Sequence, residues 1–575
     1  MVRNPRALAL IGVLVGVALV APVVMVVPRV VAPTSTASME FAEYTVLLTA
    51  TGDAGVRAAA DAAVQAAGGQ VLRENAAVGA LVVQAPATGF VEAVTADDAV
   101  FGAVRARVVG AAPPAHTAQA ASSPAAAPAV TAAATQGPAG LDPLDTQLWG
   151  LAMIKADAAR AVQAGDRRVQ VGILDSGIDA THPDLAANVD TRLSRNFVTD
   201  IPRDETGAEM DGPCEFADCI DPADHDDAGH GTHVAGIVAA AADGSGISGV
   251  APGVTLVSIR GGQDSGLMFL QPVIDALTYG ADIGLDVINM SFFVDPWLYN
   301  CLDNPADPPE ARIAQRTTVE AVSRALEYAH AKGVTLVGSL GNGHVDLGSP
   351  GSDPTSPNSP AGGAYPRKID NGTCLLLPAE GPHVIGVSAV GPSGIKADYS
   401  NYGLEQVSVA APGGWFQDGF GTPSFRRADN LVLSTYPRSL LEASGAVDAK
   451  GAVTALGTAN GVESFCGSRG CGYYVPLQGT SMAAPYVAGV AALVVSEFGT
   501  PDPQHPGNLT MPPDEVERVL VDTAAPRSCP APVVSYTREG RTPDFDAQCA
   551  GDAEFNGHYG AGIVDALAAV SADAR

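Results

Sequence analysis

The chain has 575 residues, of which 47% are hydrophobic and 16% charged, and its formal net charge is −30. A chain of this length is too long to fold around one ordinary hydrophobic core, so we expect more than one domain. Binding to a polyanion requires lysines and arginines that displace counterions, so the acidic balance excludes nucleic acid as a partner and instead favours solubility.

The N-terminus has the pattern of an export signal. Arg3 and Arg6 precede an apolar run over residues 7–27, and small residues follow as far as Ser38. Residues 1–37 are therefore predicted to be a signal peptide, and the protein is expected to be secreted and extracellular. The run is also long enough to span a bilayer, so an uncleaved N-terminal anchor is the alternative, and a membrane is expected as a partner only in that case. No second run of about 18 apolar residues is expected further along the chain.

Residues 40–108 are predicted to form a small α/β unit, because short segments with the apolar pattern of strands are separated by two segments with the pattern of helices. The expected strands cover residues 43–49, 70–73, 79–84 and 100–109, and the expected helices cover residues 55–67 and 90–95. Residues 109–140 are rich in alanine, proline and small polar residues, which is typical of a linker.

From residue 141 to 575, short apolar strands alternate with helical patterns, which predicts an α/β fold with a parallel, doubly wound sheet covered on both faces. The expected strands are 169–174, 256–259, 287–290, 334–337, 384–387 and 407–410, and the main expected helices are 267–280, 317–331 and 481–498. In such a sheet, functional groups gather beyond the carboxyl ends of the strands. Asp175, Ser291 and the pair Gly341-Asn342 follow three of these strands.

The eight cysteines are even in number and lack the spacing of a zinc site, so disulfides in an oxidising compartment are the stronger interpretation. Eight cysteines allow 105 connectivities. Pairing of neighbours in the sequence predicts Cys214–Cys219, Cys466–Cys471 and Cys529–Cys549, which leaves Cys301–Cys374 by elimination.

Three segments contain residue types used in nucleophilic catalysis. Asp175-Ser-Gly follows a buried strand, His230-Gly-Thr-His begins a helix rich in small residues, and Gly479-Thr-Ser481 opens an apolar helix. Taken one at a time, each has a structural interpretation: a turn aspartate, a core histidine and an N-cap serine. We assign that structural role to His233 and the functional role to His230.

Together, and in the order Asp, His, Ser, the three segments resemble the subtilisin-like serine proteases (subtilases) from about residue 141 to 571. The resemblance implies a serine endopeptidase in which Ser481 is the nucleophile, His230 the general base and Asp175 the group that orients it. Leu340-Gly-Asn-Gly343 matches the family's oxyanion segment, so Asn342 and the Ser481 N–H are expected to bind the oxyanion. Protein or peptide substrates are the implied partners. A non-catalytic binding protein on the same scaffold is disfavoured by the complete set of motifs, and a membrane-anchored processing protease remains the alternative among enzymes.

The same resemblance implies a ferredoxin-like inhibitory propeptide at residues 40–108, which would make the protein an autoprocessed zymogen inhibited by its own propeptide. The mature N-terminus is then expected between Val109 and Leu141, and residues 141–575 form the catalytic domain. A structural calcium ion is also implied, because Asp184 follows Asp175 by nine residues and Asp243 follows His230 by thirteen. An acidic surface loop with an Asx turn is the alternative there. No cofactor is expected for catalysis.

Substrate-binding residues are expected at Ser291, Phe292, Phe293, Gly266 and Gly341. Phe293 and Val294 stand where the family pattern has two glycines, which predicts either a narrowed primary pocket that prefers small residues or a Phe293 side chain turned into the core. The insertion from Asp200 to Asp227, with eleven acidic residues and one arginine, is either a solvated surface or an acidic border of the cleft.

Overall fold

The structure is a computed structural model that describes residues 41–109 and 142–573. The predicted signal peptide and all of the predicted linker except Val109 lie outside the described residues.

Residues 41–109 form a small unit of four strands and two helices. A four-stranded antiparallel sheet has the order β2-β3-β1-β4, and Asp53 begins α1 by accepting hydrogen bonds from the Gly55 and Val56 N–H groups. The elements are β1 (Phe41–Leu48), α1 (Ala54–Ala66), β2 (Gln70–Asn75), β3 (Ala80–Pro86), α2 (Phe90–Val94) and β4 (Val100–Val109). Their bounds lie within two residues of the predicted ones.

A parallel sheet of seven strands organises the larger part of the chain, in the order β15-β14-β10-β8-β5-β7-β6. The strands are β5 (Gln170–Leu174), β6 (Arg195–Asn196), β7 (Thr255–Arg260), β8 (Val287–Met290), β10 (Thr335–Ser339), β14 (Val384–Val390) and β15 (Val409–Pro412). The central strands are buried on both faces, which explains their continuous apolar sequences. The prediction of a parallel doubly wound α/β sheet is confirmed.

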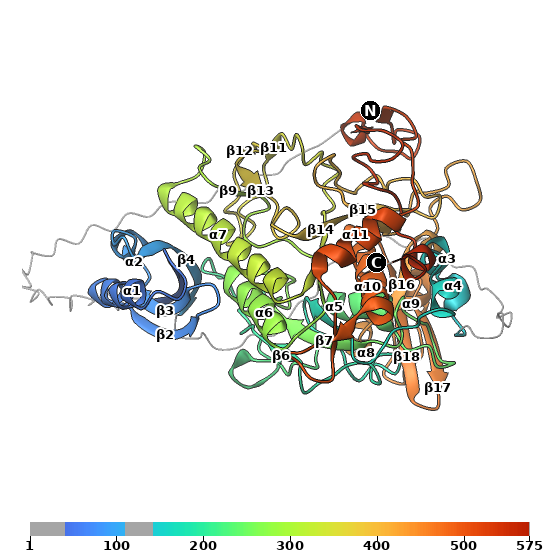
Figure 1. The fold of residues 1–575 in the computed structure, drawn as a ribbon, viewed down its shortest axis with the longest axis horizontal. Coiled ribbons are helices and arrows are strands. Elements are labelled where there is room, and N and C mark those ends of the chain that lie inside the picture. The colour runs from blue at the N-terminus through green and yellow to red at the C-terminus, as the bar shows by residue number, and fades with distance from the viewer. Residues whose placement is uncertain (1–40, 110–141, 574–575) are drawn as a thin grey trace, which may run out of the picture. The chain divides into compact units, whose positions relative to one another are not determined.

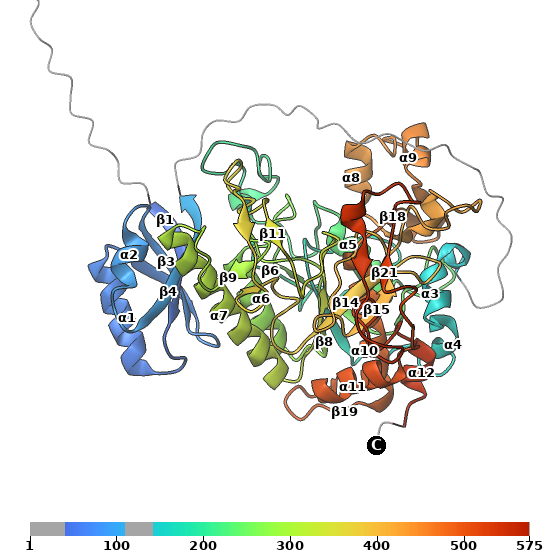
Figure 2. The same cartoon turned by 90° about the horizontal axis from the view of Figure 1, so that it is seen from above.

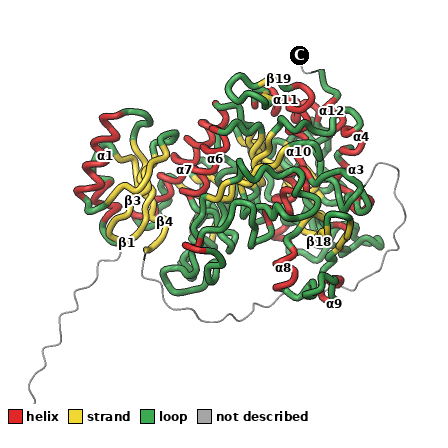
Figure 3. Tube along the Cα trace, turned by 90° about the horizontal axis from the view of Figure 1, so that it is seen from below, coloured by secondary structure: helices red, strands yellow, loops and turns green. Residues whose placement is uncertain are grey.

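Helices cover both faces of this sheet (Figures 1 and 3). α5 (His230–Ala239) and α10 (Thr480–Phe498) belong to the hydrophobic cluster on one face, together with α3 (Trp149–Met153), α4 (Ala156–Arg160), α11 (Pro513–Thr523) and α12 (Ala566–Val570). α6 (Leu270–Asp282) and α7 (Pro309–Ala331) belong to the cluster on the other face. α7 begins eight residues before its predicted start, because Pro309 stands at a first-turn position where proline is well tolerated.

α10 corrects one expectation, since it is long and apolar enough to cross a membrane. It is the helix at the centre of the core, with 83% of its most apolar window buried inside the protein. Its composition therefore reflects burial in the protein interior.

A second, antiparallel sheet has the order β16-β18-β17 and lies with α8 and α9 (Figure 2). It consists of β16 (Val432–Thr435), β17 (Glu463–Gly467) and β18 (Gly470–Leu477), next to α8 (Arg438–Ala443) and α9 (Ala455–Ala459). Short two-stranded ladders complete the described residues: β9 (Asn300–Cys301) with β13 (Cys374–Leu375), β11 (Ser352–Asp353) with β12 (Arg367–Lys368), β19 (Thr500–Pro501) with β20 (Leu509–Thr510), and β21 (Val533–Val534) with β22 (Ala547–Gln548).

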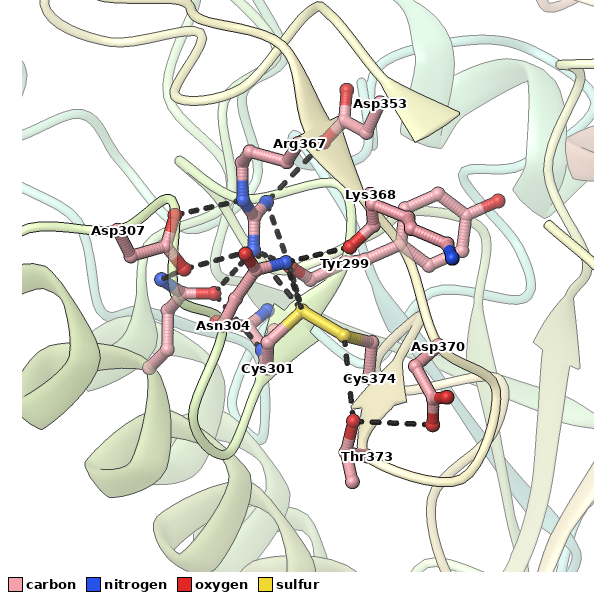
Figure 4. The surroundings of a disulfide bond; sticks show 12 residues. Tyr299, Cys301, Asn304, Asp307, Asp353, Arg367, Lys368, Asp370, Thr373 and Cys374 are labelled. Carbon is pink, nitrogen blue, oxygen red and sulfur yellow. Dashed lines mark hydrogen bonds and ion pairs between the residues drawn. A yellow bond between two sulfur atoms is a disulfide. The ribbon is translucent and has the colours of Figure 1, made fainter. Parts of the chain in front are cut away.

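All four predicted disulfides are present. Cys301 and Cys374 are direct cross-strand partners in the β9–β13 ladder. Figure 4 shows the buried Arg367 guanidinium beside this disulfide, where it pairs with Asp307 at 2.9 Å and Asp353 at 3.3 Å. The disulfide and this ion-pair network anchor the chain that follows β8.

Candidate active site

Three predicted site residues follow neighbouring strands of the parallel sheet. Asp175 follows β5, Ser291 follows β8, and Asn342 lies in the loop after β10. Because β5, β8 and β10 are adjacent and parallel, their carboxyl ends bring these residues to one edge. The fourth residue, Ser481, comes from the first turn of α10 and touches the segment after β8: the Ser291 Oγ donates a hydrogen bond to the Ser481 carbonyl oxygen at 3.0 Å.

Asp175 and His230 form a hydrogen-bonded pair. The His230 Nδ1 lies 2.8 Å from Asp175 Oδ1 and 3.0 Å from Oδ2. Asp175 is 4% exposed, whereas the His230 side chain is 36% exposed. Burial alone would lower the pKa of His230, but the charge of Asp175 and its hydrogen bond outweigh burial and raise that pKa above its ordinary value of 6.5. The pair leaves the second ring nitrogen of His230 available to exchange a proton.

Asp226, which is not among the predicted site residues, holds the start of α5 in place. This buried carboxylate accepts hydrogen bonds from the Gly229 N–H at 2.8 Å and from the Thr232 N–H and Oγ at 2.9 and 2.6 Å. It also accepts one from the Ser176 Oγ at 2.9 Å, next to Asp175. An aspartate a few residues before a helix start is the available sequence signal. Asp226 therefore couples the position of His230 to that of Asp175.

Ser481 is not hydrogen-bonded to His230. Its Oγ donates to the Ser291 carbonyl oxygen at 3.2 Å, and among the described residues no bond joins it to the imidazole. A rotation about the Ser481 Cα–Cβ bond redirects this hydroxyl. Such contacts are often long or misaligned before substrate binds.

Asn342 is oriented by Thr480, the residue before Ser481. The Asn342 Oδ1 accepts hydrogen bonds from the Thr480 N–H at 2.9 Å and from its Oγ at 3.0 Å. A methyl group added to Gly479 would lie 3.4 Å from Asn342 Nδ2 and 3.6 Å from the Ser481 nitrogen. These two nitrogens therefore border one small space at the N-terminus of α10, where backbone N–H groups and the helix dipole favour negative charge. Gly341 completes the loop with φ +91° and donates its N–H to the Thr480 Oγ at 2.9 Å.

The segment after Ser291 packs on two different cores. Phe292 is half-buried against the cluster containing α6 and α7, and Phe293 is half-buried against a cluster that includes Leu340 and Leu376. Val294 is fully buried, and its N–H donates to the Leu377 carbonyl oxygen at 2.9 Å. The Phe293 side chain is thus partly turned into the core, as one of the two alternatives predicts, and the rest of its ring is accessible.

The acidic insertion borders the exposed turn that contains Gly266. Asp211 accepts hydrogen bonds from the N–H and Oγ of Ser265, at 3.0 and 2.7 Å. Two other carboxylates of the insertion, Asp200 and Asp221, turn inward and pair with the fully buried Arg260 at 3.4 and 2.5 Å. Part of the insertion is therefore a structural ion-pair network, and part lies next to a predicted substrate-binding residue.

The two predicted calcium ligands have different surroundings. Asp184 is fully buried, its Oδ2 accepts hydrogen bonds from the Ile247 N–H at 2.9 Å and the Tyr474 OH at 2.7 Å, and its Oδ1 has no partner among the described residues. Burial, with added repulsion from Asp243 and Asp142, raises the pKa of Asp184 to about 6. The unpartnered Asp184 Oδ1 is suited to bind a cation, but Asp243 is held in an ion pair with Arg469. The predicted pair thus does not form a free calcium site.

Residues 166–562 match the sequence profile of the Subtilase family. The chain belongs to the subtilase family. It is 29% identical to subtilisin DY from Bacillus licheniformis over 352 residues, which cover 61% of this chain and 85% of that protein. It is 27% identical to thermitase from Thermoactinomyces vulgaris over 350 residues, which cover 61% of this chain and 82% of thermitase.

A solved structure of the epidermin leader peptide processing serine protease from Staphylococcus aureus has a similar fold. The TM-score is 0.57 at 19% identity, over 92% of this chain and 98% of that one. The family match and the subtilisin relatives identify the present chain as a serine endopeptidase of the subtilisin type.

Proposed function

We propose that this endopeptidase hydrolyses peptide bonds through Asp175, His230 and Ser481, with Asn342 as an oxyanion donor. The observation that carries the proposal is the Asp175–His230 hydrogen bond at the same sheet edge as Ser481 and Asn342. The test is the Ser481→Ala variant, which should lose hydrolysis.

In the proposed reaction, the Ser481 hydroxyl turns from the Ser291 carbonyl to the free nitrogen of His230. As Oγ attacks the substrate carbonyl, its proton passes to His230, and the Asp175 carboxylate stabilises the resulting imidazolium. The Asn342 Nδ2 and the Ser481 N–H hold the tetrahedral oxyanion. His230 then gives the proton to the leaving amine, and water hydrolyses the acyl-enzyme on Ser481.

The raised pKa of His230 predicts the acid limb of the pH profile. We expect kcat/KM to fall as pH decreases, with its half-maximum above pH 6.5, because a charged imidazole cannot accept the serine proton. Since the pKa is raised in the folded state, the charged pair stabilises the fold at low pH and loses that contribution as pH rises through the folded pKa. The loss of activity at low pH is therefore not caused by unfolding, because protonation of His230 does not destabilise the folded state.

Initial rates on a peptide substrate between about pH 5 and pH 9 measure this limb. Asp175→Asn should move it to lower pH, because the neutral amide no longer favours the imidazolium. An acid limb that stays in place in Asp175→Asn would contradict the assignment to His230.

Residues 40–108 are proposed to be an inhibitory propeptide that is cut away by autoprocessing between Val109 and Leu141. Support comes from the βαββαβ order of a ferredoxin-like unit. Further support comes from its polar contacts with α6: Thr45 Oγ donates to Gln271 Oε1 at 2.8 Å, and Arg73 pairs with Asp275 at 2.5 Å. Arg324 of α7 donates to the Leu48 carbonyl oxygen at 2.9 Å. These contacts keep the unit on the catalytic domain while it remains uncut.

Export is proposed from the charged and apolar N-terminus and from the four disulfides, which persist in oxidising compartments. Fractionation of an expressing culture separates the two outcomes. Protein in the medium supports secretion, and full-length protein in the membrane supports the anchored alternative.

The primary pocket is proposed to be narrowed by Phe293 and to prefer small residues before the cleaved bond. Phe293→Ala should shift cleavage toward larger residues by about 1–3 kcal/mol in the ratio of kcat/KM values, since it removes bulk from an apolar wall. Peptide-library profiling measures this shift. Phe498→Ala is the matched control, because Phe498 is also half-buried, packs on a different core and lies at the end of α10 away from Ser481. An unchanged Phe293→Ala profile in a folded protein, or the same shift in both variants, would contradict the pocket assignment.

Calcium is proposed to bind Asp184 and Asp243 only when Arg469 leaves Asp243. The unpartnered Asp184 Oδ1 supports such a site, since calcium prefers carboxylate and carbonyl oxygens.

A further inference from the structure

Arg469 lies at the tip of the β17–β18 hairpin, which is closed by the Cys466–Cys471 disulfide between directly paired residues. The hairpin is docked beside Asp184 by two polar contacts of β18. The Tyr473 N–H donates to His182 Nε2 at 3.2 Å, and the Tyr474 OH donates to Asp184 Oδ2 at 2.7 Å. The disulfide and these contacts place the tip over the loop that begins at Asp243.

The loop over residues 243–248 turns its backbone donors toward carboxylates. Asp142 accepts hydrogen bonds from the N–H groups of Asp243 and Gly244 at 3.3 and 2.6 Å, and Asp184 accepts from Ile247 at 2.9 Å. Asp142 and Asp184 are 5% and 0% exposed. These hydrogen bonds occupy some of the acceptor positions of the carboxylate oxygens, but they do not neutralise the negative charge.

Arg469 supplies the positive charge at this place. Its guanidinium forms an ion pair with Asp243 and also interacts electrostatically with Asp184 and Asp142. Arg469 is thus the arginine common to all three carboxylates, whereas Arg160 interacts only with Asp142 among them. The buried Asp184 Oδ1 has no partner among the described residues. Buried carboxylates require a nearby cation, and a divalent ion is the alternative to the guanidinium.

We propose that Arg469 is a built-in counter-cation of the Asp142–Asp184–Asp243 cluster and that it competes with calcium for Asp243. A calcium ion that uses Asp184 and Asp243 must displace the guanidinium and then lies close to its charge. Calcium binding is therefore weak while Arg469 is present, and the hairpin tip takes over the stabilising role of a metal ion.

The test compares full-length protein with and without Arg469 in a Ser481→Ala background, which prevents self-digestion and makes the readout independent of catalysis. Melting temperatures are measured in EGTA and in calcium chloride, and calcium affinity is measured by titration calorimetry. Arg469→Gln should melt lower than the parent in EGTA and bind calcium about tenfold more tightly. The melting temperature of Arg469→Gln should rise by about 3 °C from EGTA to a calcium concentration of roughly 100 Kd.

Three further variants locate the effect. Arg469→Lys keeps a cation and should behave as the parent does. Arg427→Gln is the matched control, because its side chain is 39% exposed against 40% for Arg469 and it also pairs with one aspartate. Adding Asp243→Ala to Arg469→Gln removes the side-chain oxygens at this position and should remove the gained calcium response.

Equal calcium affinity in the parent and Arg469→Gln would overturn the proposal, as would an Arg469→Gln melting temperature that is the same in EGTA and in calcium. A calcium response that survives Asp243→Ala would overturn the assignment to this site. Arg469→Gln protein that melts near the parent temperature in calcium shows that the variant is folded.

Discussion

Ser481→Ala is expected to abolish peptide hydrolysis, with kcat reduced by about 10⁶-fold, the loss known for the nucleophile of subtilisin. The reason is chemical: alanine has no hydroxyl that can form the acyl-enzyme, so the Asp175–His230 pair has no proton to accept. The residual rate should come from the oxyanion donors and substrate binding alone. Hydrolysis of unfolded casein and labelling by a fluorophosphonate probe measure the effect, and labelling should disappear with activity.

The same variant tests maturation. If the chain cuts its own propeptide, Ser481→Ala should accumulate as the uncut precursor in a host that lacks other proteases. Ser496→Ala is the control, because it makes the same replacement in the same helix, where the Ser496 Oγ bonds only to backbone groups. Casein hydrolysis at the parent rate, or normal maturation of Ser481→Ala in that host, would remove Ser481 from the mechanism.

Asn342→Ala is expected to lower kcat by about 10²–10³-fold with little change in KM. The donor is needed where charge develops on the substrate oxygen, so its loss affects the transition state more than the bound substrate. The magnitude comes from subtilisin, in which removing one such donor costs about 2.7–4 kcal/mol. Asn342 is exposed, so the replacement opens no buried cavity.

Steady-state kinetics separate this effect from a structural one. The acid limb set by His230 should stay in place in Asn342→Ala, because the Asp175–His230 bond is untouched. Thr480→Val provides a graded comparison: it removes one of the two donors to Asn342 Oδ1 and leaves both oxyanion donors in place, so a smaller loss is expected. A rise in KM with unchanged kcat in Asn342→Ala would assign the residue to substrate binding instead.

Much of the fold could be predicted from the sequence, because strands and helices of this kind leave local patterns. β8 occupies residues 287–290, as its apolar run predicts, and α10 begins one residue before its predicted start. The cysteine spacing indicated the four disulfides, since two of the pairs are 5 residues apart and a third pair is 20 residues apart, so that each joins neighbouring cysteines in the sequence. The catalytic motifs were recognisable because each is a short contiguous segment.

Tertiary structure decided what depends on segments far apart in the chain. The Ser481 hydroxyl bonds to Ser291, and the Asn342 amide is turned by Thr480. Phe293 divides its ring between a core and the accessible surface, and Asp243 meets an arginine from a distant hairpin. Local periodicity reports which face of an element is buried, but it contains no information on which distant side chain lies opposite. Whether Asp243 faces a metal ion or Arg469 is settled only by how β17 and β18 dock beside Asp184.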